Sequence, residues 1–141
     1  METLFQYRLR SPTGGLAADL TAHPVASDQS SECSLRIHQN IWLAYPLGGL
    51  YWKDAAWLSF GVALHAQILA TRHPKGLGIQ VVSLRAPLND YRSEVAALAM
   101  DGWLRAEFDL PTAGAEVSFS QAGGDYIFHW GNIESPFADH T

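Results

Sequence analysis

The first third of the chain alternates hydrophobic and polar residues with a period of two, which is typical of half-buried β-strands. Residues 3–10 show this alternation in TLFQYRLR, and residues 16–22 show it again after the turn sequence SPTGG. Together these segments predict a β-hairpin. The polar stretch HPVASDQSSE at 23–32 predicts a flexible loop, and SLRIHQNIWLAY at 34–45 predicts a third strand.

The middle of the chain changes to helical spacing. After PLGG, hydrophobic residues recur every three or four positions, which predicts a first helix that ends near Thr71, before HPKG. The short segment 78–85 is rich in β-branched residues and predicts an inner strand. Residues 91–108 then predict a second helix.

The end of the chain returns to alternation. Residues 115–131 predict two strands joined at a Gly-Gly turn, and the tail 132–141 has no period and is expected to be frayed. The predicted order is β-β-β-α-β-α-β-β. Because the strands alternate instead of being apolar throughout, one sheet face is expected to be covered and the other open. The expected fold is a single α+β domain, residues 1–141. It has two layers, a mixed, mainly antiparallel sheet of about six strands with two helices on one face.

The open sheet face is the first candidate site, because strand parity collects polar and cationic side chains there. The side chains expected on this face are Arg36, His38, Asn40, Trp42, Arg8, Arg10 and His129. Such a row can bind an anionic or aromatic group. It can equally be a solvated face on which Arg8, Arg36 and Asp19 form cross-strand pairs.

The aromatic residues give a second candidate. Five tryptophans in 141 residues are hard to bury together, so some are expected on the surface. The best candidates are Tyr51 and Trp52 before the first helix, and the row Tyr126, Phe128 and Trp130 in the last strand. Exposed aromatic side chains often dominate the binding energy of an interface. The row in the last strand is equally well explained as its core-facing side.

Composition and charge narrow the function classes. The net charge is −5, with nine Lys and Arg against fourteen Asp and Glu, which argues against partners such as nucleic acid or an anionic membrane. No apolar stretch approaches the roughly 20 residues of a membrane span, and the N-terminus has no secretory pattern, so a cytoplasmic protein is expected. Cys33 is the only cysteine, which excludes an intrachain disulfide.

The sequence contains no recognised catalytic or cofactor motif. The glycine-rich stretches do not fit a phosphate-binding loop, Ser59 lacks the context of a hydrolase nucleophile, and no histidine pair has metal-ligand spacing. We therefore expect no cofactor and no metal. His65, inside the first predicted helix, is expected to be a buried, hydrogen-bonded histidine, and a catalytic role would need a pocket beside it.

Two functions are consistent with these features. The first is a small non-catalytic protein-binding or assembly protein of adaptor or immunity type, which presents an aromatic and Arg/His surface to a protein partner or to a second copy in a homodimer. The alternative is a small cofactor-independent enzyme or carrier of lyase or cyclase type. It would bind a hydrophobic, anionic small molecule on the open sheet face, with His38 and His129 as candidate catalytic residues.

Overall fold

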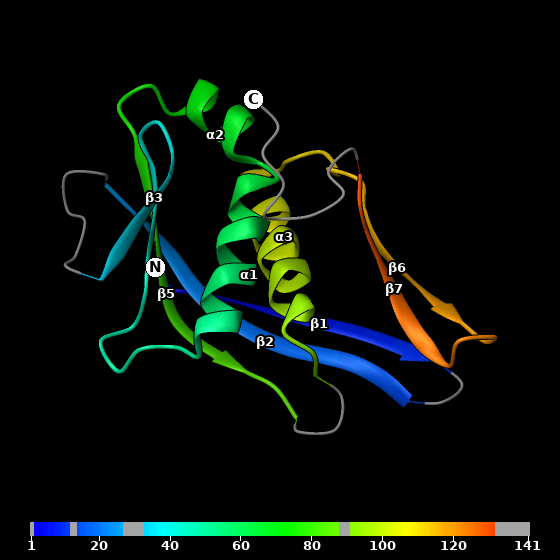
Figure 1. Cartoon of the computed structure of the whole chain (residues 1–141). Helices are drawn as coiled ribbons and strands as arrows, with labels where there is room; N and C mark the ends of the chain where they lie inside the picture. Colours follow the sequence, from blue (N-terminus) through cyan, green and yellow to red (C-terminus); the bar gives the residue numbers. More distant parts are fainter. Residues whose placement is uncertain (1, 12–13, 27–32, 88–90, 132–141) are drawn as a thin grey trace.

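The computed structural model describes residues 2–11, 14–26, 33–87 and 91–131. Figure 1 shows the arrangement of its helices and strands. In chain order the elements are β1 (Thr3–Ser11), β2 (Gly14–Val25), β3 (Ser34–His38), β4 (Ile41–Ala44), α1 (Trp52–Ala63), α2 (Ala66–Arg72), β5 (Leu77–Arg85), α3 (Glu94–Phe108), β6 (Ala115–Ser120) and β7 (Asp125–Trp130). The predicted α+β class is confirmed.

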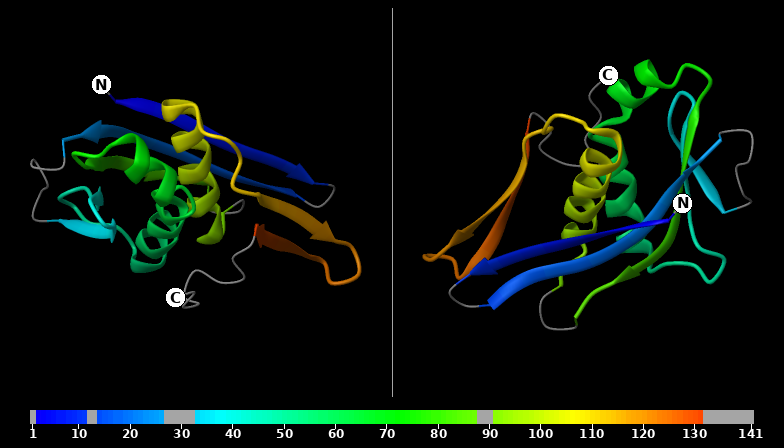
Figure 2. Two further views of the ribbon diagram at one scale, coloured as in Figure 1. Left: turned by 90° about the horizontal axis from the view of Figure 1, so that it is seen from above. Right: turned by 180° about the vertical axis from the view of Figure 1, so that it is seen from behind.

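The main sheet has five strands in the order β1-β2-β5-β4-β3. The pair β4 and β5 is parallel and the other pairs are antiparallel, so the predicted mixed, mainly antiparallel sheet is confirmed. Helices α1 and α3 lie on one side of it (Figure 2), again as predicted. Strands β6 and β7 form a separate two-stranded sheet.

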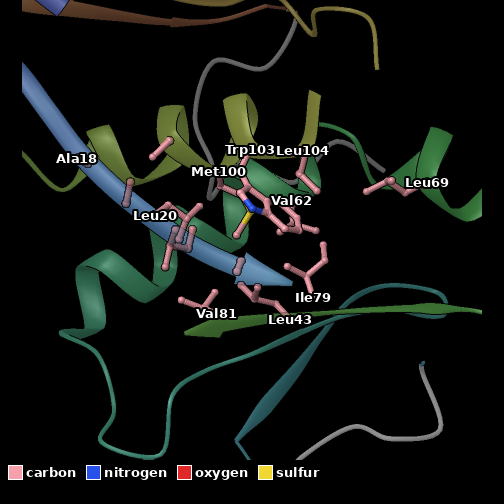
Figure 3. Close-up of a cluster of buried hydrophobic side chains, with 14 of the residues drawn as sticks. Ala18, Leu20, Leu43, Val62, Leu69, Ile79, Val81, Met100, Trp103 and Leu104 are labelled. Carbon is pink, nitrogen blue, oxygen red and sulfur yellow. The ribbon is translucent and has the colours of Figure 1, made fainter. Parts of the chain in front are cut away.

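The hydrophobic core lies between the sheet and the helices (Figure 3). The covered sheet face contributes fully buried side chains such as Leu20, Leu43 and Ile79, and the helices contribute Val62 and Met100. These strand residues are the inward half of the period-two pattern. The alternation therefore identified the buried face of the central strands.

Helix α3 is buried along ten consecutive residues, Val95 to Leu104. A helix that is apolar on every side must be covered on every side. Strands β1 and β2 cover one side and α1 another. The approach of α1 is close, because a Cβ atom added at Gly61 would lie 2.7 Å from the Cβ of Met100. The β6–β7 hairpin covers a further side through Trp130, which packs with residues of both helices.

The predicted strand 34–45 is a hairpin. Strands β3 and β4 are joined at Gln39 and Asn40, and Gln39 has a positive φ of 45°. A two-residue turn preserves the alternation of side chains, so the period-two pattern continues from β3 into β4 without a visible interruption. The pattern was correct and the turn was missed, because neither residue is a glycine.

The first predicted helix is divided into α1 and α2. The chain leaves helical geometry at His65, where φ is −115° and ψ is 5°. The segment has no proline, and its one glycine, Gly61, lies earlier, inside α1. The residue at the break is instead held by a long-range contact with α3, described below, which local periodicity does not show.

The remaining differences concern the ends of elements and the last hairpin. Strand β2 continues to Val25 through Pro24, so the start of the loop predicted at 23–32 is strand. Strand β1 pairs with β2 no further than Ala22, and a proline is tolerated where a strand has a neighbour on one side only. Residues 27–32 and the tail 132–141 lie outside the described residues. The main sheet has five strands, where about six were predicted. Strands β6 and β7 form a separate hairpin instead, which packs against the helices through Trp130.

Candidate functional site: the aromatic surface

The open face of the main sheet keeps part of the predicted row. Arg36 lies directly opposite Trp42 in the β3–β4 pair, which places both on the same face. Arg8 and Arg10 are exposed on β1. The Nη2 atom of Arg8 lies 2.7 Å from Oδ1 of Asp19 on β2, which confirms this predicted cross-strand pair. This part of the face therefore contains a solvated ion pair.

His38 and Asn40 do not belong to this row, contrary to the prediction. A β-bulge between Arg36 and His38 shifts the register, so that His38 pairs with the buried Ile41. Asn40 lies in the turn, where its Nδ2 atom donates a hydrogen bond to the carbonyl oxygen of Pro74 at 3.2 Å. The bulge interrupts the period-two alternation at His38, and the turn places Asn40 outside both strands.

His129 lies elsewhere in the molecule. It is exposed on β7, and its Nε2 atom shares a hydrogen bond of 3.3 Å with the hydroxyl of Ser118. Strand β7 belongs to the small sheet, and the helices stand between it and β3 (Figures 1 and 2). The structure therefore does not bring His38 and His129 together on one sheet face, and the prediction that they share it is wrong.

The loop before α1 and the first residue of that helix expose three large side chains, Leu47, Tyr51 and Trp52. They are 93%, 56% and 65% exposed, respectively. We call them the aromatic surface. The rings of Tyr51 and Trp52 are 6.3 Å apart between centroids, and the Nζ atom of Lys53 lies 5.6 Å from the Trp52 ring. The predicted exposure of Tyr51 and Trp52 is confirmed.

A hollow of about 440 Å³ lies beside Trp52. Its lining comes from the first two turns of α1 and from the start of α3, namely Trp52, Lys53, Ala56, Trp57, Ser93 and Glu94. The hollow is thus next to an exposed ring and has one basic and one acidic side chain at its edge. A concave surface with apolar walls and a few polar groups suits a binding site.

Polar contacts hold the elements around this hollow in place. The hydroxyl of Tyr91 donates a hydrogen bond of 2.6 Å to Oδ1 of Asp54 on α1. Burial raises the pKa of Tyr91, and the hydrogen bond to Asp54 raises it further, so the hydroxyl remains a donor near neutral pH. Arg92 bonds to Asp125 at 2.6 Å and to Glu94 at 3.0 Å. These bonds connect the segment before α3 to both α1 and the β6–β7 hairpin.

Trp130 is not part of the surface, contrary to the prediction that it is an exposed binding residue. It is 5% exposed and packs against Trp57 and Phe60 of α1, with ring centroids 5.4 and 5.2 Å away. Phe128 also stacks on Trp130, with 5.9 Å between the ring centroids. The aromatic row of the last strand is therefore core-facing, the other explanation that the sequence allowed. Its role is to attach the hairpin to the helices.

The structure contains a buried polar pair of which the sequence predicted only one member, His65. His65 is buried and hydrogen-bonded as predicted, and its partner is Asp101 on α3, with 2.6 Å between Nε2 and Oδ1. Asp101 was not singled out. The available signal was its position as the one acidic residue in the apolar run VAALAMDGWL.

The described residues contain no group of three or more His, Cys, Asp or Glu side chains that could hold a metal ion. No helix in that part of the chain is long and apolar enough to cross a membrane. Comparison of the whole chain with known protein families and with curated proteins gives no match in either case. The aromatic surface is therefore judged on its geometry alone.

Proposed function

We propose that this protein is a small non-catalytic binding or assembly protein that associates with a second copy of itself through the aromatic surface. The observation that carries the proposal is the exposure of Leu47, Tyr51 and Trp52 within residues 47–52. Aromatic side chains that project into solvent beside a hollow are typical interface anchors.

A second copy is the partner that this surface fits best. In a twofold dimer the same patch meets itself, so an exposed ring beside a hollow on one copy faces a hollow beside a ring on the other. Trp52 has this arrangement, because it lines the hollow and also projects into solvent. Lys53 and Glu94 line the same hollow, so each can face the opposite charge across a twofold axis.

The alternative function, an enzyme or carrier built on His38 and His129, has less support. The two histidines lie on separate sheets, and the open face near Arg8 contains an ion pair with Asp19. A different histidine carries a separate inference below.

Light scattering on a size-exclusion column tests the proposal. The wild-type protein should elute as a dimer, and Trp52→Ser should weaken dimerisation by about 30-fold or more, as expected for a hot-spot residue. Leu4→Ser is the matched control, because Leu4 is 57% exposed on β1 and does not belong to the aromatic surface. A monomeric wild-type protein, or equal effects of the two variants, would contradict self-association through this surface.

A further inference from the structure

The His65–Asp101 pair occupies the junction of α1, α2 and α3. His65 lies between α1 and α2, and Asp101 lies in the middle of α3. Both side chains are only 3% exposed. Burying two polar groups costs free energy unless their hydrogen bonds are satisfied, so each polar atom of the pair needs a partner.

Asp101 determines which ring nitrogen of His65 carries the proton. An ionised carboxylate only accepts hydrogen bonds, so Nε2 is the donor to Oδ1 at 2.6 Å. The second oxygen, Oδ2, is paired with Nη2 of Arg105 at 3.0 Å. In the tautomer that carries its proton on Nε2, the lone pair of the ring is on Nδ1. Within the described residues the structure gives the His65 ring no hydrogen-bond partner besides Asp101, so Nδ1 can accept a hydrogen bond from a ligand.

A cavity of about 560 Å³ has His65 among its lining residues. Its walls include Ala63 and Ile68 from the two helices and Pro111 from the segment after α3. Polar side chains are added by Gln67, Thr71 and Thr112. The volume falls in the range of small-molecule sites, roughly 300–1,000 Å³. The cavity borders the C-terminal end of α1, whereas the aromatic surface includes its first residue.

We infer that this cavity binds a small, mainly apolar molecule that carries one hydroxyl group, and that Nδ1 of His65 accepts the hydroxyl proton in a hydrogen bond. The mainly apolar walls fit the body of such a molecule, and Nδ1 of His65 can accept a hydrogen bond from its hydroxyl group. The charge of Asp101 is balanced by Arg105, so the site offers an ion no net attraction. Asp101 acts as a positioning residue that fixes the ring and its tautomer.

A pair of probes of nearly equal size tests this inference on the wild-type protein. 4-Fluorophenol has the hydroxyl donor, and 4-fluorotoluene has a methyl group in its place. Fluorine NMR line broadening during protein titration should give a tighter dissociation constant for the phenol by about 3- to 10-fold, the effect of one hydrogen bond. Equal affinities for the two probes, or no binding of either, would overturn the inference.

Three variants locate the effect. His65→Leu/Asp101→Ala removes both polar groups of the pair, including the Nδ1 acceptor, so the preference for the phenol should disappear. His129→Gln, on the exposed face of β7, should leave the preference unchanged. Ala63→Trp fills the cavity from an exposed position and should weaken binding of both probes. A preference that survives in His65→Leu/Asp101→Ala, or unchanged binding in Ala63→Trp, would place the probes elsewhere and overturn the inference.

Discussion

The substitution Asp101→Ala tests whether the buried pair is held as the structure describes. Removing the carboxylate leaves Nε2 of His65 without its acceptor on a side chain that is 3% exposed. It also removes the partner of Arg105. The guanidinium is 40% exposed, however, and can turn toward water. The first loss is therefore expected to dominate.

The size of the effect follows from these two contacts. A buried donor left without a partner costs about 1–3 kcal/mol, and loss of the exposed part of the ion pair adds at most about 1 kcal/mol. We expect Asp101→Ala to lower the free energy of unfolding by about 1–4 kcal/mol. The double variant His65→Leu/Asp101→Ala also removes the donor. It is expected to recover about 1–3 kcal/mol of that loss, because no polar atom of the pair is then left buried and unpaired.

Urea unfolding followed by tryptophan fluorescence measures these differences. Trp103 is 1% exposed in the core and reports on loss of packing. The free energies come from linear extrapolation, and the wild type, the two single variants and the double variant form a double-mutant cycle. Additive effects of the two substitutions would refute the reasoning. So would an Asp101→Ala variant within about 0.5 kcal/mol of the wild type, the range of ordinary surface substitutions.

Two further predictions concern packing and pH. Gly61→Ala should destabilise the protein by about 1–3 kcal/mol, because the new methyl group would lie 2.7 Å from the Cβ of Met100, and this crowding outweighs the gain in helix propensity of about 1 kcal/mol. Gly48→Ala, with no atom within 4 Å of the added Cβ, is the control, and equal urea midpoints would contradict the close helix contact. Burial and the hydrogen bond to Asp54 raise the pKa of Tyr91 above its ordinary value of 10.0, so its stabilising contribution is full below pH 10 and is lost as the pH rises toward the folded-state pKa. Tyr91→Phe should therefore lose less stability than the wild type between pH 10 and 11.5 in chemical unfolding, and equal slopes would argue against this contact.

Local periodicity predicted much of the fold because several elements repeat one pattern without interruption. The hairpin β1–β2, strand β5, helix α3 and the hairpin β6–β7 all lie where the spacing placed them. The pattern also identified the buried side of the central strands, such as Leu20 and Ile79. Each of these features depends on residues that are close in sequence.

The features that were missed depend on residues that are far apart or on turns that preserve the pattern. The turn at Gln39 does not disturb the alternation of β3 and β4, so it gives no signal of its own. The break between α1 and α2 lies at His65, whose side chain bonds to Asp101, 36 positions along the chain. The choice of partner for β6 and β7 is also nonlocal, since either sheet would satisfy the same alternation.

The candidate site shows the same division. The exposure of Tyr51 and Trp52 was predictable because both lie at the junction of a loop and a helix, where little covers a side chain. Trp130 was not predictable, because a strand side that faces a partner and one that faces the core have the same period. The surplus of aromatic residues is in fact divided between the surface and the contact of the hairpin with the helices.

The buried pair separates stability from binding. A buried ion pair is weak evidence for stability, because apolar residues of similar volume often replace it without loss. If His65→Leu/Asp101→Ala is nearly as stable as the wild type and yet no longer prefers 4-fluorophenol over 4-fluorotoluene, the pair contributes to ligand recognition more than to folding. If the double variant is instead as unstable as Asp101→Ala alone, the polar contact is needed to hold α1, α2 and α3 together at the break. The same variant in the two assays therefore decides which property depends on the polar atoms at this junction.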